Sequence, residues 1–354
     1  MVTGQRGSAQ EPFPYQIFDR YLGSLVTQIG MPGLSAIIVE EGRIAWKGEY
    51  GYADLERKIP ATIDTPYPVG GITQSLTGVL VGVCIDRFGF EIDQDIRMFA
   101  PTFPVAQTRV RQVLAHATDG RFRYDPTLFS ALTPVVESCM KQSFRQATAV
   151  EILDRITPMM TRSVPGLDLG RPEGAAALAQ FDARTVARYQ SVLSELAVPY
   201  KSDARGRPSR SEYPSYGLDA AGGLVSTAYD LAQFEMALGN RGVPVPLSFS
   251  TLDQMWSNQI FKINNIDLVM PTGLGWFVTQ ESGQRLVWTF GHIPDASSAL
   301  IVRMISPEAP GRPSRRLTLI LLANSGGLAQ GYDLQNANVT SSPFVKVFLR
   351  LFIS

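Results

Sequence analysis

The sequence has few of the residues that build metal centres or disulfide frameworks. It holds two histidines and two cysteines in 354 residues, and Cys84 and Cys139 have neither the number nor the spacing of a zinc site or a disulfide framework. Cys84 falls in an apolar run, where a buried thiol is expected, and the sequence leaves open whether both thiols are free. We therefore expect no metal and no other cofactor.

An excess of charge is also absent, as are long apolar runs. The 32 basic residues balance the 32 acidic ones, which gives no electrostatic attraction to nucleic acid or to an anionic membrane. No apolar run reaches the roughly 18 residues of a transmembrane helix. Residues 1–12 are polar and lack the apolar core of a signal peptide, so we expect a flexible tail there. A cytoplasmic chain and an exported chain whose leader was removed both remain open.

The composition that remains is that of a folded globular protein. Hydrophobic residues make up 45% and charged residues 18% of the chain, and 354 residues suffice for one large domain or two intergrown ones. Hydrophobic periodicity and turn residues predict the main elements. Helices are predicted at residues 13–30, 79–85 and 344–352, strands at residues 34–39, 43–50, 299–305 and 317–324, and an exposed loop at residues 202–212.

Residues 67–78 organise the rest of the chain. An aromatic residue and a short glycine turn lead into the apolar helix there, which resembles the first active-site segment of the serine β-lactamase and penicillin-binding-protein superfamily. In that family Ser-x-x-Lys begins the central helix. Here Gly71 stands at the serine position and Gln74 at the lysine position. The resemblance therefore implies the family's scaffold without its nucleophile and base.

The two replacements remove the usual acyl-serine chemistry. Glycine has no side chain to acylate, and the neutral amide of Gln74 cannot take a proton near pH 7. Ser75 lies one turn beyond Gly71 on the same helical face and is the alternative nucleophile, although the sequence shows no base beside it. Ser-x-x-Lys does occur at residues 138–141, in the helix after Tyr124, and we interpret it as a chance match.

The second and third active-site segments of the family also have altered counterparts. Tyr124 stands at the tyrosine position of the family's Tyr-x-Asn motif, and Pro126 replaces the asparagine that would position a substrate. His292 keeps the donor position of the third segment, but Pro294 and Asp295 replace glycines of a turn that is also shortened. Pro294 lacks a backbone N–H, and the Asp295 carboxylate opposes an anionic substrate. Tyr124 is open to two roles, proton shuttle or aromatic pocket wall.

The resemblance extends over nearly the whole chain, in about six segments that keep the family's order. One of them, residues 110–120, contains His116, which is expected to be a structural hydrogen-bonding residue that supports a loop. The resemblance implies an α/β fold in which an antiparallel sheet is flanked by helices. The expected units are a sheet domain of residues 13–70 and 220–354, and a mainly helical domain of residues 71–219 with a variable cap region.

These residues predict a protein with the family's fold and a different use of its pocket. Gly71, Gln74, Tyr124 and His292 are expected to line a cavity that is larger and less charged than the family's. Such a cavity suits a small neutral or apolar ligand, either bound only or converted by Tyr124 and His292 in a non-hydrolytic reaction such as an isomerisation or cyclisation. The alternative is an active esterase or amidase that uses a displaced nucleophile. The sequence identifies no ligand and no oligomeric state.

Overall fold

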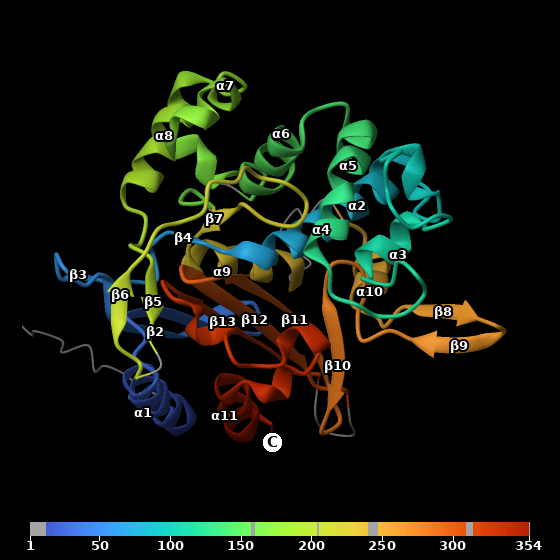
Figure 1. Cartoon of the computed structure of the whole chain (residues 1–354). Helices are drawn as coiled ribbons and strands as arrows, with labels where there is room; N and C mark the ends of the chain where they lie inside the picture. Colours follow the sequence, from blue (N-terminus) through green and yellow to red (C-terminus); the bar gives the residue numbers. More distant parts are fainter. Residues whose placement is uncertain (1–11, 157–159, 204, 240–246, 309–313, 354) are drawn as a thin grey trace, which may run out of the picture.

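The computed structural model of the chain describes residues 12–156, 160–203, 205–239, 247–308 and 314–353. The tail expected at residues 1–12 therefore lies outside the described residues, apart from Pro12. A seven-stranded antiparallel sheet forms the centre of the molecule, with the strand order β10-β11-β12-β13-β1-β2-β3 (Figure 1). Its strands are β1 (Gly33–Glu40), β2 (Arg43–Asp54), β3 (Ile59–Pro60), β10 (Phe277–Glu281), β11 (Gln284–Ile293), β12 (Ser297–Ile305) and β13 (Arg316–Ala323).

The middle of the sheet is buried on both faces. β1 and β13 pair with each other, so the sheet joins segments from the two ends of the chain, and both strands are almost continuously apolar and buried. Alternate side chains of a strand point to opposite faces. Ile38 and Leu319 belong to one hydrophobic core, and Ile37 and Ile320 belong to the other.

Helices cover both faces of this sheet. α1 (Phe13–Gln28) and α11 (Pro343–Phe352) pack on one face and against each other, as the predicted apolar stripes require (Figure 1). α9 (Ala228–Gly239) and the central helix α2 (Thr73–Phe88) contribute to the core on the opposite face. The predicted α/β architecture is therefore confirmed.

Most of the remaining elements are short. The other helices are α3 (Val110–Leu114), α4 (Pro126–Phe129), α5 (Thr133–Met140), α6 (Phe144–Thr148), α7 (Ala175–Leu178), α8 (Ala183–Ser194) and α10 (Phe249–Met255). Three two-stranded ribbons lie outside the central sheet: β4 (Tyr67–Pro68) with β7 (Val225–Ser226), β5 (Tyr200–Ser202) with β6 (Pro208–Arg210), and β8 (Ile260–Ile263) with β9 (Ile266–Val269). The exposed loop predicted at residues 202–212 is wrong in part, because Ser202 ends β5 and residues 208–210 form β6, which pairs with it.

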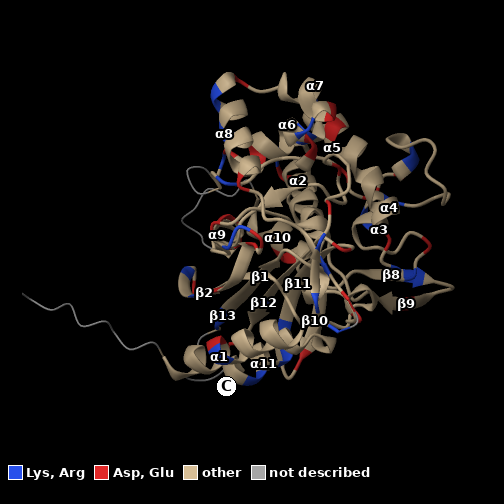
Figure 2. Cartoon of the chain, turned by 60° about the vertical axis from the view of Figure 1, so that its left-hand side comes forward, with Lys and Arg blue, Asp and Glu red and all other residues tan. Residues whose placement is uncertain are grey.

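The central helix is buried over most of its length. Every residue from Thr73 to Cys84 is buried, and the helix ends where Gly89 takes a left-handed conformation with φ of 64°. None of the helices in the described part of the chain is both long and apolar enough to cross a membrane. Figure 2 shows basic and acidic residues interspersed along the chain, in keeping with their equal numbers.

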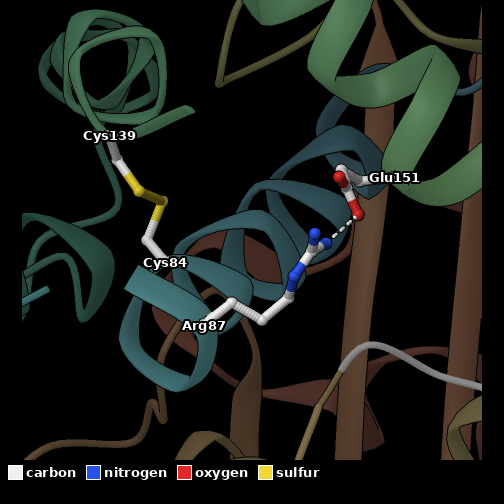
Figure 3. Close-up of a disulfide and its surroundings, with 4 residues drawn as sticks. All are labelled: Cys84, Arg87, Cys139 and Glu151. Carbon is white, nitrogen blue, oxygen red and sulfur yellow. Dashed lines mark hydrogen bonds and ion pairs between the residues drawn. A yellow bond between two sulfur atoms is a disulfide. The ribbon is translucent and has the colours of Figure 1, made fainter. Parts of the chain in front are cut away.

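A disulfide joins the central helix to its neighbour. Cys84 of α2 bonds to Cys139 of α5, with 6.1 Å between their Cα atoms (Figure 3). One turn further along α2, Arg87 forms an ion pair of 2.6 Å with Glu151. The expectation of a buried thiol at Cys84 is therefore wrong. The sequence could not show the bond, because the two cysteines are 55 residues apart and meet only through the packing of α2 on α5.

We predict that this disulfide makes a large contribution to stability. A crosslink across 55 residues restricts the unfolded chain, and the chain-entropy relation gives roughly 4 kcal/mol for a loop of this size. Urea unfolding of the double variant Cys84→Ala/Cys139→Ala should show a free energy of unfolding lower by about that amount. Cys139→Ala alone, and the wild type under reductant, should lose the same amount. An unchanged unfolding midpoint under reductant would contradict the bond.

Candidate functional site

The position of Gly71 is enclosed by two other segments of the chain. Gly71 lies in the 3-10 turn η1 (Gly70–Ile72), directly before α2, and β11 passes beside this turn. A Cβ atom on Gly71 would lie 2.6 Å from the carbonyl oxygen of Phe290 and 2.8 Å from the hydroxyl oxygen of Tyr124. Both distances are far shorter than van der Waals contact. The larger cavity expected from the loss of the serine is therefore not present at Gly71.

The close approach continues along the strand. A Cβ on Gly291 would collide with the carbonyl oxygen of Val69, and a Cβ on Gly70 would lie 3.1 Å from the backbone nitrogen of His292. Gly70 also has a φ of 52°, in the left-handed region that favours glycine. Backbone therefore packs on backbone where η1 meets β11, and this contact requires residues without side chains.

Gln74, which is expected at the family's lysine position, belongs to a neutral hydrogen-bond chain. Its Oε1 lies 3.0 Å from Nε2 of His116, and its Nε2 donates to the hydroxyl oxygen of Tyr124 at 3.2 Å. The backbone N–H of Asp125 donates to Nδ1 of His116 at 3.3 Å. Nδ1 is therefore an acceptor, so the imidazole proton sits on Nε2 and is donated to Gln74. Both ends of the Gln74 amide have partners.

Burial keeps this chain uncharged. Desolvation lowers the pKa of His116 to about 3. The imidazole is stacked on the ring of Phe129, with 4.9 Å between ring centroids. Desolvation also raises the pKa of Tyr124 to about 12, against a smaller lowering by the Gln74 hydrogen bond. Near pH 7 the three side chains His116, Gln74 and Tyr124 are therefore all neutral, and none of them is a strong base.

Tyr124 forms part of an aromatic wall. Its ring lies 5.1 Å from that of Phe290 and 5.9 Å from that of Phe277, between centroids. Tyr124 itself remains partly exposed, as does Gly71. Its hydroxyl accepts the Gln74 hydrogen bond, and within the described residues its own proton has no hydrogen-bond acceptor. Tyr124 is therefore a partly exposed member of an aromatic cluster that carries one free neutral donor.

His292 lies on the same strand but in a more open position. It is exposed near the end of β11, and its Nε2 lies 3.3 Å from where a Cβ on Gly326 would be. Partial burial lowers the pKa of the imidazole, and the nearby Asp295 carboxylate acts in the opposite direction. In the described part of the chain the imidazole makes no hydrogen bond. The structure thus joins Gln74 to Tyr124 directly and places His292 on the strand that contacts Gly71.

The other predicted site residues have local roles. Ser75 is buried and its hydroxyl donates to the carbonyl oxygen of Ile72 at 2.7 Å. Pro126 is the exposed first residue of α4, where a proline costs no hydrogen bond. Asp295 is exposed with a φ of 57°, and its carbonyl oxygen accepts a hydrogen bond from the Ser211 hydroxyl.

A cleft lies beside the altered third segment. It has a volume of about 930 Å³, and its walls include Pro294 and Asp295 on one side and Ser211, Tyr213 and Arg171 of the cap region on the other. The Ser211–Asp295 hydrogen bond ties these two sides together. No group of three or more potential metal ligands occurs among the described residues.

Two features of the site were missed by the sequence analysis. Phe290 and Gly291 supply the backbone that encloses η1, and His116 contacts Gln74 directly. Gly291 carried a usable signal, since a glycine inside an otherwise apolar and aromatic strand marks a close backbone approach. The His116–Gln74 contact had no signal in the sequence, because it joins residues 42 positions apart.

The comparison with protein families gives one match over most of the chain. The sequence profile of the Beta-lactamase family matches residues 18–341. Among curated proteins, the chain is 29% identical over 97 residues to "Beta-lactamase" of Escherichia coli (strain K12), covering 27% of this chain and 26% of that protein. It is 29% identical over 140 residues to "D-aminopeptidase" of Cereibacter sphaeroides (strain ATCC 17029 / ATH 2.4.9), covering 39% and 25%.

The mitochondrial serine beta-lactamase-like protein LACTB of Homo sapiens is 27% identical over 77 residues, which are 22% of this chain and 14% of that protein. The matched segments thus span only about a quarter or less of these curated relatives' own lengths.

Solved structures show the same fold at low sequence identity. The "beta-lactamase from Sulfitobacter sp. EE-36" superposes with a TM-score of 0.68 at 16% identity, covering 97% of this chain and 99% of that one. The "octameric penicillin-binding protein homologue from Pyrococcus abyssi" gives a TM-score of 0.68 at 20% identity, covering 88% and 74%. At these identities the likeness establishes the fold.

We predict that any side chain at position 71 destabilises the protein. Gly71→Ala places a Cβ 2.6 Å from the Phe290 oxygen and 2.8 Å from the Tyr124 hydroxyl, and such overpacking costs about 1–3 kcal/mol. Gly222→Ala is the matched control, because its Cβ would meet no atom closer than 3.9 Å, and its effect should stay within about 0.5 kcal/mol.

Urea unfolding measures both variants, and a cycle with Tyr124→Phe separates the two contacts. The cost of Gly71→Ala should be smaller in the Tyr124→Phe background, since one of the two close atoms is gone. Equal stability of Gly71→Ala and Gly222→Ala would show that the site has room for a side chain after all.

We also predict that His116 makes a contribution to the free energy of unfolding that is lost in acid. Its pKa of about 3 in the folded chain lies below the ordinary value of about 6.5. The unfolded chain therefore takes up this proton first as the pH falls. The stabilisation is complete above pH 6.5 and decreases as the pH falls towards 3, by on the order of 3 kcal/mol between pH 7 and pH 4.

The measurement is the free energy of unfolding against pH for the wild type and for His116→Gln, and the difference between the two curves isolates this residue. Subtraction is needed because burial raises the pKa of Asp230 to about 6, which acts in the opposite direction over the same range. Parallel curves for the two proteins would show that His116 titrates normally.

Proposed function

The chain belongs to the Beta-lactamase family, and from this premise we propose that it is a member without acyl-serine chemistry that binds a small neutral ligand in the altered active-site region. The observation that carries the proposal is the state of the two catalytic positions. At Gly71 there is no nucleophile and no space for one, and at Gln74 a neutral amide has both ends engaged. Fold alone does not decide function, so the site residues carry the argument.

The polarity of the site favours a neutral ligand. His116 and Tyr124 are held in their uncharged forms by burial, and the usual lysine is absent. A buried anion would find no cation in the chain of His116, Gln74 and Tyr124, and placing it there would be costly. The free proton of the Tyr124 hydroxyl suits a ligand with a carbonyl or ether oxygen, and the surrounding aromatic rings suit an apolar body.

The adjoining cleft supplies a place for the rest of a ligand. Pro294 and Asp295 form one wall of this volume of about 930 Å³, within three residues of His292. Residues of the variable cap region form the other wall, so this region would set the choice of ligand. The curated relatives' printed activities do not carry over, because the matched segments are short.

A specific observation supports non-hydrolytic catalysis as a second candidate. The lowered pKa of His292 favours a neutral imidazole, and the raised pKa of Tyr124 keeps a protonated hydroxyl. A neutral acceptor and a neutral donor are the groups that a proton-shifting isomerisation or a cyclisation requires. Displaced-nucleophile hydrolysis has less support, because the Ser75 hydroxyl is buried and donates to Ile72.

The first test is covalent labelling. After incubation with penicillin or a fluorophosphonate, intact-mass spectrometry should show an unmodified chain. The double variant Gly71→Ser/Gln74→Lys should also remain unlabelled or turn over esters only slowly. The new Cβ collides with Phe290 and Tyr124. The shortened turn at Pro294 and Asp295 should also misplace an oxyanion donor, and loss of one such donor typically costs about 10²–10³ in rate. A stoichiometric adduct on Ser75 would favour the hydrolase instead.

The second test measures binding directly. Acetophenone is a neutral carbonyl compound that cannot be hydrolysed, and its affinity can be followed by ligand-observed NMR. Tyr124→Phe should weaken it about fivefold, the effect of one hydrogen bond, while Tyr21→Phe on the exposed side of α1 should not change it. Affinity should also be constant from pH 5 to pH 9. The absence of saturable binding, or equal binding by Tyr124→Phe, would contradict the proposal.

A further inference from the structure

A loop that leads into β7 runs along the first turns of the central helix. It comprises residues 216–224. The Thr77 hydroxyl donates to the carbonyl oxygen of Ala220 at 2.7 Å, and the backbone N–H of Leu224 donates to the Thr73 hydroxyl oxygen at 3.4 Å. These bonds fix the loop to the helix that begins directly after η1.

The same loop comes close to η1 itself. A Cβ on Gly222 would lie 4.0 Å from the carbonyl oxygen of Gly70 and 3.9 Å from Cε2 of Tyr216. Gly222 is partly exposed, so the space beside it is bounded by the Tyr216 ring and by η1. The next residue of η1 is Gly71, whose Cβ position lies 2.8 Å from the Tyr124 hydroxyl oxygen. Both tyrosines therefore lie beside this three-residue turn.

Asp219, in this loop, has a carboxylate with one unused oxygen. Its Oδ1 accepts hydrogen bonds from the backbone N–H groups of Ala221 at 2.7 Å and Gly222 at 3.0 Å, which fixes the side chain in a turn. Its Oδ2 has no hydrogen-bond partner among the described residues. Asp219 is partly exposed, and Oδ2 is not one of the fully enclosed atoms without a partner. This oxygen therefore faces space that a ligand can enter.

Tyr216 carries a second free polar group near this carboxylate. Its hydroxyl has no hydrogen-bond partner in the described part of the chain and is likewise not enclosed. Burial raises the pKa of Tyr216, the Asp219 carboxylate raises it further, and Arg171 lowers it. Arg171 is a wall residue of the cleft of about 930 Å³. Tyr216 is therefore a neutral residue near both that cleft and η1.

The free oxygen of Asp219 selects for a donor on the ligand. An alcohol and an ammonium group could both donate to it. Burial already raises the pKa of Asp219, which shows that water around this carboxylate is restricted. Removing an ammonium group from water costs several kcal/mol, and one carboxylate oxygen does not reliably offset that cost. An alcohol donates the same kind of hydrogen bond at a much smaller desolvation cost.

We propose that Asp219 is a specificity-determining residue of the altered site, and that the ligand is a neutral molecule with an oxygen acceptor at one end and an alcohol group at the other. The acceptor takes the proton of the Tyr124 hydroxyl, the alcohol donates to Oδ2 of Asp219, and the Tyr216 ring contacts the body between them. The inference rests on the function proposed above and specifies the class of ligand for the same site.

The probes are 4′-(hydroxymethyl)acetophenone and 4′-(2-hydroxyethyl)acetophenone, two neutral ketones whose alcohol groups differ in reach. 4′-(Methoxymethyl)acetophenone offers only acceptors, and 4′-(aminomethyl)acetophenone is a cation near pH 7. Ligand-observed NMR gives each affinity relative to acetophenone with the same protein, so a general change of the site cancels. At least one alcohol should bind about tenfold more tightly than acetophenone, the effect of a hydrogen bond to a charged group. The ether should gain nothing.

Asp219→Asn tests the carboxylate while it keeps the turn. The amide oxygen can still accept the two backbone hydrogen bonds, and the free atom becomes an N–H donor. The advantage of the alcohol over the ether should disappear, because both can accept from an amide N–H. Asp182→Asn is the matched control, since Asp182 is exposed at the start of α8 and also accepts a backbone hydrogen bond, from Thr185. It should keep the wild-type order of affinities.

Gly222→Val tests the location. A Cβ at position 222 would meet no atom closer than 3.9 Å, so the variant should fold, which urea unfolding checks. The new side chain narrows the space between Tyr216 and η1 without touching the charge of Asp219. The alcohols should then bind no better than acetophenone.

The two levels of the account fail in different ways. Absence of saturable acetophenone binding would remove the proposed function and this inference together. Saturable acetophenone binding that depends on Tyr124, but with no gain for either alcohol, would overturn this inference alone. An alcohol preference that persists in Asp219→Asn would do the same. Tighter binding of the aminomethyl ketone than of both alcohols would show that the site takes a cation.

Discussion

The contact between η1 and β11 is the constraint on which the altered site depends. Backbone meets backbone there, and a Cβ on Gly71 or Gly291 would overlap a carbonyl oxygen of the opposite segment. The start of the central helix is therefore held against the sheet at a distance that only glycine permits. In the family this start carries the nucleophile. In this chain Phe290 and the Tyr124 hydroxyl enclose Gly71 and leave no space for a Cβ there, which supports the proposal that the serine is lost.

The second consequence of this arrangement is electrostatic: the side chains around Gln74 are uncharged. A lysine at position 74 would require a charged environment, whereas Gln74 links His116 to Tyr124 through two hydrogen bonds between neutral groups. Burial alone lowers the pKa of the histidine and raises that of the tyrosine, so the three residues stabilise one another without charge. The disulfide between α2 and α5 holds the same helix from its other end. Together these contacts hold the start of α2 in an uncharged environment.

The sequence predicts the fold because apolar periodicity is local. The stripes of α1 and α11 and the continuous apolar runs of β1 and β13 each follow from neighbouring residues. The features that it does not predict depend on distances across the fold. They include the Cys84–Cys139 bond, the crowding at Gly71 and the contact of His116 with Gln74. The β5–β6 ribbon was also missed, since its strands are only three residues long and, apart from Tyr200, exposed.

The central claim is that a neutral hydrogen-bond chain has replaced the nucleophile and base. The measurement that tests it most directly is ¹⁵N NMR of the imidazole rings across pH, which is simple here because the chain has two histidines, and His292→Asn assigns the signals. We expect His116 to show the Nε2–H tautomer and to remain unprotonated down to pH 4. A His116 that carries its proton on Nδ1, or that titrates near the ordinary histidine pKa of about 6.5, would contradict the account.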